Sequence, residues 1–107
     1  MVEIVKETKV LNGKTYKCKC AEYTFDFNVE DSQIVEGQIY CSASDLSLPD
    51  IAIDVVGNLN VEIYVLFPVS EVPYNCVDDF VFKLKHAQKA AEEMREFFDE
   101  IRARYVS

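Results

Sequence analysis

The sequence predicts an α+β fold in which about six antiparallel strands pack against one C-terminal amphipathic helix. Three observations predict it. Apolar and polar residues alternate over short segments within residues 2–67, as in strands that are buried on one face. Turn-forming residues separate these segments, and apolar residues then recur at helical spacing from 87 to 105. The chain has 107 residues, and we expect a single domain, 1–107, because half of it could not bury a core of its own.

The first two strands are expected at 2–11 and 14–29, with a turn at 12–14, because Asn-Gly accepts the positive φ of a tight turn. Within 14–29 the apolar residues occupy even positions up to Cys20 and odd positions from Ala21 onward. Strand side chains alternate with a period of two, so this change of phase needs an extra residue. The sequence therefore predicts a β-bulge near Cys20, in a coiled sheet or a partly open barrel. The alternative is a strand that passes from one sheet to another at this point.

Three further strands are expected in the middle of the chain. A polar turn precedes a strand at 34–41, and a loop at 42–50 follows it. Gly57-Asn58 then joins two clearly alternating segments, 51–56 and 59–67, into a second hairpin.

Residues 79–85 fit two structures. We favour a short strand, because the segment is rich in aromatic and β-branched residues and because Lys83 and Lys85 would be unfavourable near the start of a helix. The alternative is a helix that is capped by Asp78 or Asp79. In either case a helix occupies about 86–105, and its apolar stripe consists of Ala87, Ala90, Ala91, Met94, Phe97, Phe98, Ile101 and Tyr105.

The charge distribution is uneven. The net charge is −8, and residues 20–82 contain twelve acidic residues and no Lys or Arg, whereas residues 1–19 contain five Lys and two Glu. This pattern excludes direct nucleic-acid binding through the middle of the chain and favours a basic partner. The first ten residues contain charges throughout, and no apolar run is long enough to cross a bilayer. We therefore expect a cytoplasmic protein without a membrane partner.

The four cysteines, Cys18, Cys20, Cys41 and Cys76, equal the number that binds a structural zinc ion. Their spacing lacks paired Cys-x-x-Cys motifs, and the first three occupy apolar positions of the expected strands. We interpret those three as core residues, and Cys76 as an exposed thiol in a polar loop. A small zinc- or thiol-dependent protein is the minor alternative.

No catalytic or cofactor motif is present. His86 is the only histidine, and we interpret it as a surface residue at the start of the helix. A Cys76–His86 pair would lack a third orienting group. With three glycines the chain has no Gly-rich phosphate loop, so we expect no cofactor, no metal and no enzymatic activity.

The outward face of the sheet is the candidate binding site. It combines acids with tyrosines and carries no cation, which is typical of a protein-binding surface. The alternative interpretation is that the acids only keep the sheet soluble, or that the lysines of the first hairpin neutralise them. The candidate residues are Glu22, Asp26, Glu30, Glu36, Tyr40, Asp54, Glu62 and Tyr64.

These features favour a non-catalytic protein-binding module that docks its acidic sheet face on a basic partner. A nucleic-acid-handling protein is the most natural owner of such a surface, and the chain would then act as an inhibitor or a nucleic-acid mimic. The alternative is a self-associating structural or chaperone-like subunit that forms a homo-oligomer.

Overall fold

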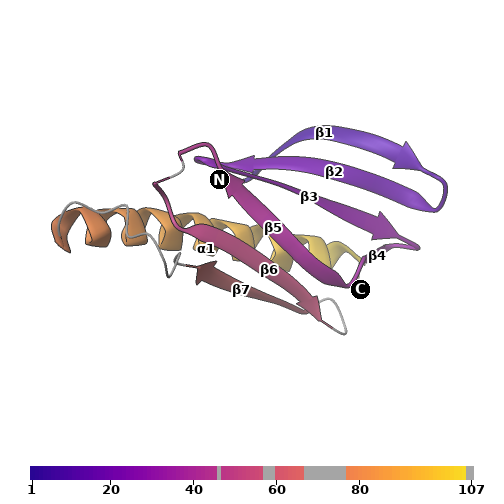
Figure 1. Cartoon of the computed structure of the whole chain (residues 1–107). Helices are drawn as coiled ribbons and strands as arrows, with labels where there is room; N and C mark the ends of the chain where they lie inside the picture. Colours follow the sequence, from indigo (N-terminus) through magenta and orange to yellow (C-terminus); the bar gives the residue numbers. More distant parts are fainter. Residues whose placement is uncertain (46, 57–59, 67–76, 106–107) are drawn as a thin grey trace.

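The computed structural model describes residues 1–45, 47–56, 60–66 and 77–105 (Figure 1). One antiparallel sheet packs against a single C-terminal helix and is not closed into a barrel, so the predicted α+β fold is confirmed. No helix within these residues is long and apolar enough to span a membrane. The elements are β1 (Glu3–Val10), β2 (Gly13–Cys20), β3 (Tyr23–Glu30), β4 (Gln33–Ile34), β5 (Gly37–Ala43), β6 (Asp50–Val56), β7 (Asn60–Leu66) and α1 (Val77–Tyr105).

The sheet consists of two halves that are joined at one end. The strand order is β1-β2-β3-β5-β6-β7, and the short β4 pairs with β3. β3 pairs with β5 only through Tyr23–Ala43 and Thr24–Ser42. Beyond these two pairs β5 diverges from β3, as Figure 1 shows. β1 and β7 therefore form the two outer edges, with α1 behind the sheet.

The predicted bulge near Cys20 is wrong, because residues 14–29 form two strands and not one. Cys20 pairs with Tyr23, so Ala21 and Glu22 form a two-residue turn between β2 and β3. Ala21 has a φ of 51°, which is uncommon for a residue with a side chain. This turn accounts for the change of phase, since both strands place their apolar residues on the helix side. An irregularity does occur in the first hairpin, but it lies in β1 between Ile4 and Lys6.

The predicted strand at 34–41 is divided. Asp31 and Ser32, with φ of 50° and 63°, form a tight turn that pairs β4 with the end of β3. β4 ends at Ile34, which is buried, and β5 begins at Gly37. The inward residue here is therefore Ile34, whereas Val35 is exposed.

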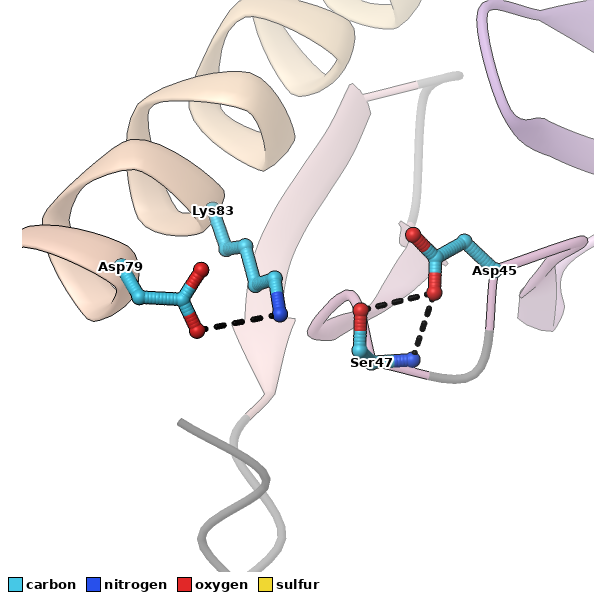
Figure 2. A network of polar contacts seen from close by, with 4 residues as sticks. All are labelled: Asp45, Ser47, Asp79 and Lys83. Atoms are coloured by element: carbon cyan, nitrogen blue, oxygen red, sulfur yellow. Dashed lines mark hydrogen bonds and ion pairs between the residues drawn. The ribbon is translucent and has the colours of Figure 1, made fainter. Parts of the chain in front are cut away.

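The favoured strand at 79–85 is also wrong, because this segment belongs to α1. The helix begins at Val77, with Asp78 and Asp79 in its first turn, where the helix dipole favours negative charge. Lys83 then pairs with Asp79 at 3.1 Å between Nζ and Oδ2 (Figure 2). The lysines lie beyond the first turn and one is neutralised, so the objection to a helix here does not hold.

The loop before β6 lies beside this part of α1. The Asp45 carboxylate accepts hydrogen bonds from Ser47 N at 2.9 Å and Ser47 Oγ at 2.7 Å, and these bonds lower the pKa of Asp45. Figure 2 shows Lys83 between Asp79 and this loop, and its charge also lowers the pKa of Asp45. The loop leads directly into Asp50, the first residue of β6.

The core lies between the sheet and α1. Ala87, Ala90, Met94, Phe98 and Ile101 are buried on the helix, which confirms most of the predicted stripe. The side chain of Tyr105 lies outside the described residues. Aromatic rings from β3 pack against the helix, and the buried sheet residues are Cys18, Cys20, Tyr23, Phe25, Phe27, Val29, Ile34, Cys41, Ile51, Ile53, Val55 and Val61. Among the described residues, the helix covers only this face of the sheet, and the opposite face is not in contact with it.

Candidate protein-binding surface

The candidate surface lies on the side of the sheet that faces away from α1. In β6 the residues Ile51, Ile53 and Val55 point to the helix and are buried, so Asp50, Ala52 and Asp54 occupy the other face. The same alternation places Gln38 and Tyr40 of β5, and Glu62, Tyr64 and Leu66 of β7, on this outer face.

A row of three residues forms its centre. Tyr40 lies opposite Ala52, and Ala52 lies opposite Tyr64. Ala52 is only 1% exposed although it is on the outer face, whereas Tyr40 and Tyr64 are 55% and 44% exposed. Directly opposed residues are about 5 Å apart, so the two tyrosines are separated by about 10 Å, with the alanine methyl group between them. Ala52 therefore lies beneath the surface between the two exposed tyrosine side chains.

The next row is acidic. Asp54 lies opposite Gln38 on one side and opposite Glu62 on the other. Like charges that face each other across two strands destabilise a sheet. None of the three strands contains Lys or Arg. Two arginines of α1 reach β7, but they do not face this row: Arg95 donates a hydrogen bond to Val61 O, and Arg102 donates one to Asn60 Oδ1.

Two carboxylates orient the phenol groups. The Tyr40 hydroxyl donates to Asp50 Oδ2 at 2.9 Å, and the Tyr64 hydroxyl donates to Glu62 Oε2. These hydrogen bonds raise the pKa of both tyrosines, so the phenols stay protonated at neutral pH. Each carboxylate also has a second oxygen that can pair with a cation. We name this set, Tyr40, Asp50, Asp54, Glu62 and Tyr64, the acidic patch.

The other four predicted residues do not belong to the acidic patch. Asp26 on β3 lies directly opposite Lys17 of β2, and Glu22 in the β2–β3 turn accepts a hydrogen bond from Ser44 Oγ at 2.8 Å. Glu30 lies at the end of β3, opposite Gly13. Glu36 lies in the connection from β4 to β5 and lines, with Asp26, a shallow cavity of about 170 Å³. Neutralisation by the first hairpin therefore applies to β3, where Lys17 faces Asp26, and not to β6 and β7.

Sequence reasoning missed Asp50 and Ala52. The sequence predicts a loop at 42–50 that includes Asp50, and its candidate surface residues do not include Ala52. The alternation in "DIAIDVV" contains the signal, since Asp50, Ala52 and Asp54 share one phase. The role of Ala52 also depends on which residues lie opposite it on β5 and β7, and a single strand does not specify this.

Cys18, Cys20 and Cys41 lie in the core, as predicted, and each is fully buried. Burial raises the pKa of Cys18 and of Cys41 to about 12 and that of Cys20 to about 11. The Cys20 thiol donates to Glu93 Oε2 at 3.3 Å. No group of three or more His, Cys, Asp or Glu within the described residues is placed to hold a metal ion. Cys76 lies outside the described residues.

The core thiols should be almost unreactive in the folded chain. We expect the Cys76→Ser variant to react with an alkylating reagent at pH 8 only after unfolding. A thiol with a pKa of about 11 is ionised to about one part in a thousand at that pH, and the thiolate is the reactive form. The measurement is mass spectrometry of the alkylated chain with and without denaturant. Rapid labelling of any of the three in the absence of denaturant would contradict their placement in the core.

His86 is not at the start of the helix, because α1 begins at Val77. The residue is partly buried, and among the described residues its Nε2 atom has no hydrogen-bond partner. It lines a cavity of about 230 Å³ together with Ala21, Lys89 and Glu93. Cys76 lies outside the described residues, so the structure does not place it relative to this histidine.

Comparisons with family models, with curated proteins and with solved structures found no match to this chain. The surface chemistry is therefore the basis on which a function can be proposed.

Proposed function

We propose that the chain is a non-catalytic protein-binding module that docks its acidic patch on a basic surface of a partner protein. The proposal rests on two neighbouring rows of residues across β5, β6 and β7. One row contains Tyr40 and Tyr64, the other contains Asp54 and Glu62, and the three strands contain no Lys or Arg. A partner that brings cations to Asp54 and Glu62 relieves the repulsion between them. The exposed rings of Tyr40 and Tyr64 supply apolar contact area at the same place.

The chemistry of the patch indicates which partner fits. Arg and Lys side chains can pair with the carboxylates while their aliphatic parts lie against the tyrosine rings. Proteins that bind nucleic acids present such clusters of Arg and Lys to the phosphate backbone. The chain would then act as an inhibitor that occupies the site of the nucleic acid.

Charge reversal tests the proposal. We expect the Asp54→Lys/Glu62→Lys variant to capture no partner from a lysate of the host under conditions in which the unmodified chain captures one. With the purified partner, the affinity should fall by at least about 100-fold, because like charges facing each other across an interface cost several kcal/mol. The loss should appear mainly as slower association, and binding by the unmodified chain should weaken as salt rises. Surface plasmon resonance at two salt concentrations measures both.

A matched control has the same net charge. The Glu92→Lys/Asp99→Lys variant changes two exposed acids of α1, away from the patch, and should bind as the unmodified chain does. If the partner binds nucleic acid, the unmodified chain should displace that nucleic acid and the patch variant should not. A partner whose affinity is indifferent to salt and to the Asp54/Glu62 reversal would show that the patch is not the interface.

A further inference from the structure

The first hairpin carries the opposite charge on the same outer face. Lys6 of β1 lies directly opposite Lys17 of β2, and Lys19 follows on the same side. All three are exposed, and β1 is exposed along its whole length. We name these three lysines the basic patch. Asp26 of β3 lies opposite Lys17, and Glu3 of β1 lies opposite Lys19, so two of the three lysines face an acid across a strand, whereas Lys6 faces Lys17.

The acidic patch and the basic patch carry opposite charges. Each contains a pair of like charges directly across two strands, Lys6–Lys17 in one and Asp54–Glu62 in the other. Directly opposed like charges are unfavourable, and Asp26 offsets only one charge of the lysine pair, so each pair can still gain from contact with the other. They cannot meet within one chain, because they lie toward opposite edges of one sheet (Figure 1).

We propose that the acidic patch of one copy docks on the basic patch of a second copy, so that two chains form a two-fold dimer through the outer faces of their sheets. This inference rests on the proposed function, since it uses the same acidic patch and names a partner for it. A two-fold axis that runs between the stacked sheets, parallel to the strands, places β1 and β2 of each copy over β6 and β7 of the other. The contact between an acidic and a basic patch then forms twice, and the assembly closes as a dimer.

The dimer should be weak and should depend on salt. The strands that meet are β1 and β2 with β6 and β7. With a spacing of about 4.8 Å and rows of about five residues, these four strands give roughly 300 Å² of contact per copy, in two separate areas. That area is below the range of stable specific interfaces, so the dimer should be transient. Each copy has a net charge of −8, which opposes association over distance, but at physiological salt this repulsion is screened beyond about 8 Å. The contacts between the patches act within that distance.

Exchange of charge between the patches tests the dimer. One variant, Asp54→Lys/Glu62→Lys, reverses the acidic patch, and a second, Lys6→Glu/Lys17→Glu, reverses the basic patch. In sedimentation velocity at about 0.15 M salt, where the repulsion between the net charges is screened, we expect the unmodified chain to form dimers as concentration rises and each variant alone to remain monomeric. An equal mixture of the two variants should form dimers again, since the basic groups of one then meet acidic groups of the other at both contacts.

Three results would overturn the proposal: a monomeric unmodified chain up to about 1 mM at about 0.15 M salt, a dimer that persists in both variants, or a mixture of variants that stays monomeric. The Glu92→Lys/Asp99→Lys variant controls for net charge and should dimerise as the unmodified chain does. If a reversed variant does not fold, as judged by circular dichroism, the neutral changes Asp54→Asn/Glu62→Gln and Lys6→Gln/Lys17→Gln replace it and should weaken the dimer.

The basic-patch variant separates this inference from the proposed function. Lys6→Glu/Lys17→Glu leaves the acidic patch intact, so it should lose self-association and still capture the basic partner. If the chain does not self-associate but its acidic patch captures a partner, only the inference about the second copy fails. If the chain dimerises through the patches and captures nothing else, the dimer is the function of the patch, and the proposal of a foreign partner fails.

Discussion

Phe98→Ala should lower the free energy of unfolding by about 3–5 kcal/mol, the range for removing a large aromatic side chain from a core. Phe98 is 1% exposed and lies where α1 crosses the sheet. Its ring centroid is 5.8 Å from that of Phe25, 5.4 Å from that of Phe27 and 5.4 Å from that of Phe97. Truncation removes the centre of this cluster and leaves a cavity that the surrounding rings cannot fill without leaving their rotamers.

The same helix provides the control. Phe82 is 69% exposed, so Phe82→Ala should change the free energy of unfolding by less than about 0.5 kcal/mol. Urea denaturation followed by circular dichroism measures both variants, with equal slopes required for the comparison. If Phe98→Ala costs less than about 1 kcal/mol, the packing of α1 on the sheet described above is wrong.

The sequence predicts the helix and its buried face well because that pattern is local. Met94, Phe98 and Ile101 recur at helical spacing, and all three are buried. The sequence does not predict the start of the helix, because residues 80–85 have high strand propensity. Two opposite signals, the acids Asp78 and Asp79 in the first turn and the ion pair of Asp79 with Lys83, favour a helix here. Near a helix N-terminus a lysine is unfavourable for the helix dipole, but the ion pair of Lys83 with Asp79, four residues earlier, stabilises the helix.

The turn at Ala21 could not be predicted from composition. Residues at positive φ are usually Gly, Asn or Asp, and neither Ala21 nor Glu22 is one of these. The change of apolar phase was a correct signal of a break in the strand. A bulge and a two-residue turn both explain such a change, and only the pairing of Cys20 with Tyr23 separates them.

The sequence predicts individual residues of the outer sheet face but not which of them are neighbours. The period of two placed Tyr40, Asp54, Glu62 and Tyr64 on the outer face, and the structure bears this out. Which residues become neighbours depends on strand order and register, which join segments far apart in the sequence. The weak β3–β5 pairing separates the acids of β3 from the patch, and no local pattern shows it.

Gly13 provides the last test, because it is required for a reason other than the predicted one. Asn-Gly was expected to form the turn, with the glycine at positive φ. In the structure Val10 pairs with Gly13, so the turn consists of Leu11 and Asn12, and Gly13 is the first residue of β2. A Cβ atom at this position would lie 1.7 Å from the backbone oxygen of Val29 on β3. The glycine is therefore needed for close approach of two strands.

Gly13→Ala should lower the free energy of unfolding by about 1–3 kcal/mol, since the added carbon meets backbone that must shift. Gly13→Asn distinguishes the two explanations. Asn tolerates positive φ, so a turn glycine would accept it with little loss, whereas close approach makes Asn at least as costly as Ala. Urea denaturation of both variants gives the comparison. An Asn variant that is clearly more stable than the Ala variant would show that the turn lies at Gly13 and that the register of the first hairpin, which aligns Lys6 with Lys17, is wrong.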